Sequence, residues 1–177
     1  MKRCNNNLFL MAILLGAFMF NCKPASAQNT RAQKTAAKKQ TIKKMVDNQN
    51  YVFMAQMAMP QGWNTIPLNY DYDVIVTKDS VETYLPYYGR VYVAPMNPND
   101  PAETGIRFKS KKFDYNGGTK KSGWEINITP YDVKETRQMI LSISDLGYAN
   151  LNIISNNRQP ISFNGYITEN KPKDKKQ

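Results

Sequence analysis

Residues 123–168 read GWEINITPYDVKETRQMILSISDLGYANLNIISNNRQPISFNGYIT, and apolar side chains in this stretch alternate with polar ones. A period of two is typical of half-buried β-strands, which pack one face and leave the other wet. The last two runs, 148–155 and 161–168, flank the turn residues 156–160 and predict a hairpin. Short links of this kind join neighbouring strands antiparallel, because a parallel crossover needs a dozen or more residues. The stretch therefore predicts an antiparallel meander.

The same alternation extends back towards Tyr51. It is present in Tyr72/Val74/Val76, Val81/Thr83/Leu85 and Ile106/Phe108, with turn signals at Lys78-Asp79, Asn116-Gly117-Gly118 and Asp145-Leu146-Gly147. Segments 59–70 and 95–104 carry five prolines and are predicted loops. About eight to ten strands in sequence make either an up-and-down barrel or a two-layer sandwich. We favour the barrel, because a closing meander removes its edges and the pattern shows no Greek-key crossing.

Residues 1–27 have the layout of a secretory signal peptide. Lys2 and Arg3 precede an apolar run, residues 8–20, and Ala25-Ser26-Ala27 follows ahead of Gln28. We expect cleavage between Ala27 and Gln28 and export of the mature chain. Cys22 offers the alternative of a lipid anchor, but it follows Asn21 where lipoprotein signals prefer a small residue, so anchoring at Cys22 is the less favoured reading.

The rest of the chain divides into three parts. Residues 28–50 form a basic arm with a helix near 34–48, residues 51–170 form the β-barrel domain, and residues 171–177 form a tail that we expect to be disordered. The helix carries a narrow apolar stripe, Ile42, Met45 and Val46, at helical spacing. We expect this stripe to lie against the barrel or close one of its ends.

The net charge of +10 belongs to the two ends of the chain. Residues 51–170 contain 11 basic and 12 acidic side chains, so the predicted barrel is close to neutral. It lacks the positive stripe that duplex binding demands, and we expect no nucleic-acid partner. The basic ends could make peripheral contact with an anionic membrane, or serve only as solvated arms.

Composition argues against catalysis and metal binding. The chain has no histidine, and both cysteines, Cys4 and Cys22, fall in the signal-like segment. We therefore expect no enzyme, no catalytic residue, no cofactor and no metal. The nearest carboxylate pair, Asp71 and Asp73, is better explained as the exposed start of a strand than as an acid pair facing across a cleft.

Two groups of residues are candidates for binding a ligand or partner. The first is Tyr87, Tyr88 and Arg90, which could stack on a sugar ring or hold the polar end of an apolar ligand. The second is Asn156, Asn157 and Arg158, which could present a cation and amides to a carboxylate. Each group also has a structural reading, because tyrosine favours strands and asparagine favours turns.

Four of these stretches together resemble the domain-of-unknown-function family numbered 4251, which comprises small exported proteins of Bacteroidetes-type bacteria. They are residues 84–90 (YLPYYGR), 105–108 (GIRF), 123–126 (GWEI) and 155–167 (SNNRQPISFNGYI). The resemblance implies a periplasmic or envelope location and a lipocalin-like β-barrel. It brings no activity, substrate or catalytic residue.

Two hypotheses for function follow. The chain is either a non-enzymatic binder of a small apolar or amphipathic ligand inside the barrel, or an envelope interaction or scaffold protein whose core is filled. A hydrolase is a third alternative only if two carboxylates converge in a cleft.

Overall fold

The computed structural model describes residues 27–94, 97 and 104–171. The expectations for the apolar leader, for Cys22, for most of the loop 95–104 and for all of the tail except Lys171 lie outside these residues.

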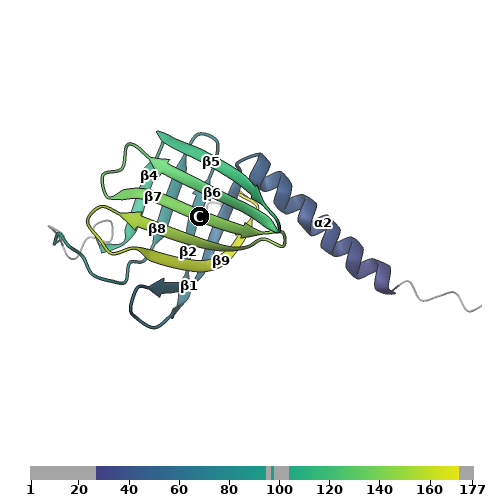
Figure 1. Ribbon diagram of the computed structural model, residues 1–177, viewed down its shortest axis with the longest axis horizontal. Coiled ribbons are helices and arrows are strands. Elements are labelled where there is room, and N and C mark those ends of the chain that lie inside the picture. Colours follow the sequence, from purple (N-terminus) through teal and green to yellow (C-terminus); the bar gives the residue numbers. More distant parts are fainter. Residues whose placement is uncertain (1–26, 95–96, 98–103, 172–177) are drawn as a thin grey trace, which may run out of the picture. The chain divides into compact units, whose positions relative to one another are not determined.

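The described chain contains nine antiparallel strands that form a nearly closed barrel (Figure 1). The strands are β1 (Tyr51–Pro60), β2 (Ile66–Val76), β3 (Val81–Leu85), β4 (Ile106–Ser110), β5 (Phe113–Lys120), β6 (Gly123–Pro130), β7 (Thr136–Ser144), β8 (Tyr148–Ser155) and β9 (Ile161–Thr168). Their order in the sheet is β4-β3-β2-β1-β9-β8-β7-β6-β5, so the first strand pairs with the last and β4 and β5 are the two ends of the sheet. The predicted antiparallel meander, its barrel form and the range of eight to ten strands are confirmed.

Alternating side chains from the strands meet in one hydrophobic core. Its largest fully buried members are Tyr51, Phe53, Phe163, Leu85, Ile126, Ile128, Met139, Leu141, Leu151, Ile153 and Ile161. Burying each such side chain contributes about 1.5–3 kcal/mol, so this cluster is the main source of stability. Bulky side chains therefore occupy the interior that the strands enclose.

Helix α2 (Ala27–Asp47) precedes the barrel. It begins earlier than the expected start at residue 34, because alanine, lysine, glutamine and arginine, all strong helix formers, dominate residues 27–40. Ile42, Met45 and Val46 are buried in the core cluster, which confirms that the apolar stripe packs on the barrel. In the part of the chain that the structure describes, no helix is long and apolar enough to span a membrane.

Two predicted connections are wrong. Most of the expected loop 59–70 is strand, since β1 ends at Pro60 and β2 begins at Ile66. Pro67 is tolerated in β2 because β3 pairs only with residues 73–76, so the first half of β2 has no neighbour on that side. The expected turn at Asn116-Gly117-Gly118 lies inside β5, which pairs with β6 as far as Lys120 opposite Gly123.

Candidate functional site

The barrel has a seam where backbone pairing is missing. We call "the seam" the gap between residues 105–110, which contain β4, and residues 132–136, which comprise most of the link from β6 to β7 and the first residue of β7. β4 is a terminal strand of the sheet, so one of its edges has no partner strand. Side chains rather than a ladder of backbone hydrogen bonds close this gap, one at each end.

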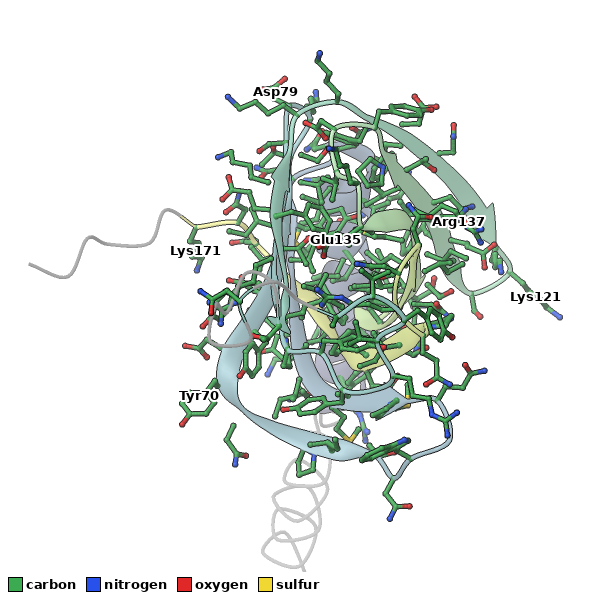
Figure 2. The ribbon with its side chains drawn as sticks, turned by 90° about the vertical axis from the view of Figure 1, so that its left-hand side faces the viewer. Tyr70, Asp79, Lys121, Glu135, Arg137 and Lys171 are labelled. Carbon is green, nitrogen blue, oxygen red and sulfur yellow. The ribbon has the colours of Figure 1, made fainter. Side chains whose placement is uncertain are left out.

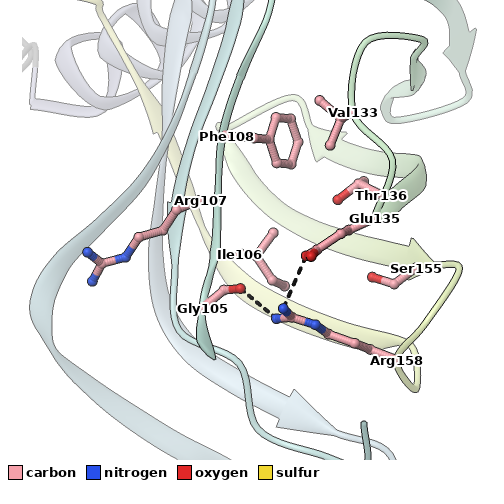
Figure 3. Close-up of a pocket in the computed structure, with 9 residues that line it drawn as sticks. All are labelled: Gly105, Ile106, Arg107, Phe108, Val133, Glu135, Thr136, Ser155 and Arg158. Carbon is pink, nitrogen blue, oxygen red and sulfur yellow. Dashed lines mark hydrogen bonds and ion pairs between the residues drawn. The ribbon is translucent and has the colours of Figure 1, made fainter. Parts of the chain in front are cut away.

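Arg158 closes one end of the seam. It extends from the β8–β9 turn, and its Nη1 donates a hydrogen bond to the Gly105 carbonyl oxygen at 2.6 Å (Figure 3). Nη2 donates to Oε2 of Glu135 on the opposite side of the seam at 3.1 Å. The Arg158 side chain is only 4% exposed whereas Glu135 is 47% exposed. A buried guanidinium therefore joins the two sides, with its carboxylate partner at the surface.

Asp132 closes the other end. Its carboxylate accepts hydrogen bonds from the Ser110 hydroxyl at 2.5 Å and from the Lys111 backbone N–H at 2.9 Å. Both donors favour the ionised form, so they lower the pKa of Asp132 below its usual range.

A cavity of about 170 Å³ lies in the seam between these two closures. Figure 3 shows Arg158 at one end of it and Phe108 and Val133 on facing walls. The complete lining is Gly105, Ile106, Arg107, Phe108, Val133, Glu135, Thr136, Ser155 and Arg158. The walls thus combine apolar side chains with two hydroxyls, one carboxylate and the Arg158 guanidinium, whereas the Arg107 side chain points away from the cavity (Figure 3). This mixture suits a ligand with an apolar body and a polar end.

The two candidate groups from the sequence lie side by side. An isolated bridge pairs Val91 with Arg158, and the Gln159 N–H donates to the Arg90 carbonyl oxygen at 3.0 Å. The Tyr87 hydroxyl lies 2.7 Å and 3.0 Å from the carbonyl oxygens of Arg90 and Gln159. The Tyr87 ring also stands beside the Arg158 guanidinium, with its centroid 5.2 Å from Cζ. Burial raises the pKa of Tyr87.

Within these groups, the side chains have different surroundings. Arg158 is the one member that lines the cavity, Tyr87 supports it and Tyr88 packs against the core. Arg90 is exposed and uses its backbone in the contacts just described. Asn156 donates from Nδ2 to the Lys134 carbonyl oxygen and so fixes the β6–β7 link. The Asn157 side chain is half-buried, and its backbone oxygen accepts from the Tyr92 N–H.

Sequence reasoning missed the far side of the cavity. Val133, Glu135 and Thr136 belong to a link and a strand start with no motif of their own. Only the fold places them opposite β4.

A second group of aromatic side chains lies outside the seam. Tyr70, Tyr72 and Tyr84 lie next to one another, and the Arg107 guanidinium stands 4.0 Å from the centre of the Tyr84 ring. Tyr70 protrudes from β2 and is 76% exposed (Figure 2). None of these four residues belongs to the two candidate groups predicted from the sequence.

Among residues 27–94, 97 and 104–171, no three acidic, histidine or cysteine side chains lie close enough to hold a metal ion. The interpretation of Asp71 and Asp73 as an exposed strand start is wrong for Asp73, because β2 begins at Ile66 and Asp73 is buried, whereas Asp71 is exposed.

Comparison with known proteins adds the family. The model of a domain of unknown function (DUF4251) matches residues 33–167. The chain belongs to the DUF4251 family. The resemblance found in its motifs is therefore confirmed.

A crystal structure of a DUF4251 family protein from Bacteroides eggerthii is similar in fold, with a TM-score of 0.56 at 16% sequence identity. The match covers 76% of this chain and 91% of the Bacteroides protein. At this identity the likeness shows the fold alone. No curated protein matches the chain.

Proposed function

We propose that this DUF4251 protein is a non-enzymatic binding protein of the periplasm or cell envelope. It holds a small amphipathic ligand with an anionic end in the seam cavity. The observation that carries the proposal is the buried Arg158 guanidinium at one end of a cavity with apolar walls. Export is supported by the signal-like layout of residues 1–27, and the envelope location by the resemblance of the motifs to small exported proteins of this family.

The size and chemistry of the cavity define the ligand class. Apolar cavities of about 150 Å³ bind molecules the size of benzene, so a volume of about 170 Å³ fits a single ring or a short branched chain. Arg158 would face the carboxylate of such a ligand, because guanidinium and carboxylate form strong charge-assisted hydrogen bonds. Bulky side chains fill the central interior, which favours the seam over the barrel axis as the place for a ligand.

Glu135 is the internal competitor of this ligand. It accepts from Arg158 Nη2, and because it is half exposed it can turn to solvent when another carboxylate arrives. Glu135→Gln removes the competing charge. We expect this change to tighten carboxylate binding about fivefold, since a partly exposed ion pair contributes about 1 kcal/mol.

Benzoate is a suitable probe, with benzyl alcohol as its neutral counterpart. In a titration followed by NMR, benzoate should shift the backbone amide signals of residues around Phe108, Val133 and Thr136. Benzyl alcohol should shift the same signals less. Val133→Phe fills the cavity and should abolish these shifts. Val93→Phe makes the same change at a 63% exposed site and should leave them intact. Shifts that persist in Val133→Phe, or no localised shift with benzoate or other small carboxylates, would refute the proposal.

An interaction protein with a filled core is the second candidate function. It is favoured by the packed interior and by the surface formed by the exposed Tyr70 and Tyr84 with the half-buried Tyr72 and Arg107. Exposed tyrosine and arginine are enriched at protein interfaces. Cross-linking in intact cells should then trap one protein through this surface, and loss of the product in Tyr70→Ser would support it. If several cross-linking chemistries trap nothing there, this candidate fails.

Peripheral contact of the basic ends of the chain with an anionic membrane stays a prediction.

A further inference from the structure

The two terminal strands of the sheet differ in how their free edges are used. At the ends of β4, Gly105 accepts from Arg158, and Ser110 and Lys111 donate to Asp132. For β5, the hydrogen bonds of the described residues include none to the backbone of residues 113–120 from outside the β5–β6 ladder. Residues 116–120 of β5 are also exposed. β5 thus presents an open edge that can pair with another strand.

The backbone direction along β5 follows from its pairing with β6. The Tyr131 N–H donates to the Lys112 carbonyl oxygen, so even-numbered residues direct their backbone groups towards β6. In an antiparallel ladder, successive residues direct their backbone N–H and C=O groups to opposite edges of the strand. Tyr115, Gly117 and Thr119 therefore direct their N–H and C=O groups to the open edge.

We propose that β5 pairs antiparallel with β5 of a second copy of this chain, around a two-fold axis at Gly117. Such an interface is self-complementary, as a two-fold dimer requires. Gly117 pairs with the partner's Gly117, and Tyr115 with the partner's Thr119, all through outward-directed backbone groups.

The charged side chains favour this register over the two neighbouring registers, in which the axis lies at Asn116 or at Gly118. With the axis at Gly117, Asp114 lies opposite the partner's Lys120, and by symmetry the pair occurs twice. An axis at Asn116 would place Lys112 opposite the partner's Lys120, which is repulsive. An axis at Gly118 would leave Lys120 opposite an uncharged asparagine. Only the central register sets opposite charges against each other.

The surface shape is compatible with this pairing. Gly118 leaves a hollow lined by residues of β5 and β6, and Lys121, at the tip of the β5–β6 hairpin, projects outward (Figure 2). Asp114 and Lys120 are exposed, and each has a contact within its own chain. Asp114 accepts a hydrogen bond from the Tyr131 hydroxyl, and Lys120 forms an ion pair with Glu125.

Sedimentation velocity of the purified protein over a range of concentrations tests the proposal. One strand pair is a small interface, so we expect a reversible dimer with a dissociation constant of about 10–100 μM. Asp114→Lys and Lys120→Asp each create like-charge pairs and should weaken the dimer at least tenfold. The double variant D114K/K120D restores opposite charges with reversed sign and should recover dimerisation.

The double variant distinguishes pairing from damage to the monomer. Both intrachain contacts, Asp114 with Tyr131 and Lys120 with Glu125, are lost in it, so recovery can come only from the contact between copies. Lys121→Asp, at the hairpin tip outside the paired segment, is the control and should change dissociation less than threefold. A monomer up to about 1 mM, a dimer indifferent to the single reversals, or a double variant no better than the singles would overturn the proposal.

Discussion

At the scale of single residues, Arg158 has the most demanding surroundings. Its charge is buried and satisfied by a backbone carbonyl on one side of the seam and a carboxylate on the other. Such a residue contributes to stability and, in our proposal, to binding. The two roles can be measured separately, because Glu135→Gln alters binding while leaving the bond to Gly105 in place.

Arg158→Met should destabilise the fold by about 2–3 kcal/mol, because the buried Gly105 carbonyl loses its donor. The loss of the ion pair with Glu135 adds little to this destabilisation, since the Glu135 carboxylate can return to water. Urea denaturation measures the change. Arg90→Met removes an exposed guanidinium from the same region and should cost less than about 0.5 kcal/mol. Equal losses in the two variants would mean that Arg158 does not hold the seam.

Asp132 should make the stability of the seam depend on pH. Its pKa is lowered in the folded state by the Ser110 hydroxyl and the Lys111 N–H, so its contribution is fully present above the ordinary aspartate value of about 3.9. It is lost as the pH falls through the lowered pKa. The wild type should therefore exceed Asp132→Asn in stability at pH 5–7, and this gap should shrink below pH 4. As a control, Asp79→Asn, in the exposed β2–β3 turn, should be as stable as the wild type at both pH values. A difference in stability between the wild type and Asp132→Asn that persists at pH 2 would contradict this role of Asp132.

The sequence predicted some residues of the candidate site and missed others, and the reason is physical. Arg158 stands out in a turn motif, whereas Thr136 and Val133 gain importance only from their position opposite β4. Local patterns report the chemistry of one segment. They cannot report which distant segment comes to face it.

At the scale of elements, the pairing of β1 with β9 joins the first strand to the last in the middle of the sheet, and the two backbones approach closely at Gly165. A Cβ at Gly165 would lie 1.9 Å from the Met54 carbonyl oxygen, beside the bulge between Ala55 and Met57. The backbone would have to move to accept any side chain. The β1–β9 pair therefore depends on a glycine that the alternation of apolar and polar residues does not reveal.

Gly165→Ala should cost about 3 kcal/mol, because overpacking against backbone cannot be relieved by a rotamer change. Gly118→Ala is the matched control, since the nearest atom to its added Cβ is 3.9 Å away. Thermal or urea unfolding of both variants gives the comparison. If Gly165→Ala were as stable as Gly118→Ala, the close approach of β9 to β1 would be wrong.

Strand identity was predictable where apolar and polar side chains alternate, and unpredictable where they do not. β7 and β8 were predicted directly from their sequence, and their alternating apolar residues Met139, Leu141, Ile143, Leu151 and Ile153 are buried. β5 contains Asn116-Gly117-Gly118, residues typical of turns, and its strand form depends on β6 beside it. Tertiary pairing overrides local preference there.

At the scale of the whole molecule, alternation showed which side chains share a face but not whether that face encloses a space. The core cluster shows that side chains from around the barrel meet inside it. Ligand binding on the barrel axis would displace this core, whereas binding in the seam would displace only Glu135 and solvent. The likeness to lipocalins and the export of the chain stay predictions.

The most direct test of the seam as a ligand site is a crystal structure of the protein grown with benzoate. Our account predicts density for the ring between Phe108 and Val133, with its carboxylate within about 3 Å of Arg158 and Glu135 turned to solvent. Benzoate along the barrel axis, or an empty seam cavity at saturating benzoate, would contradict it.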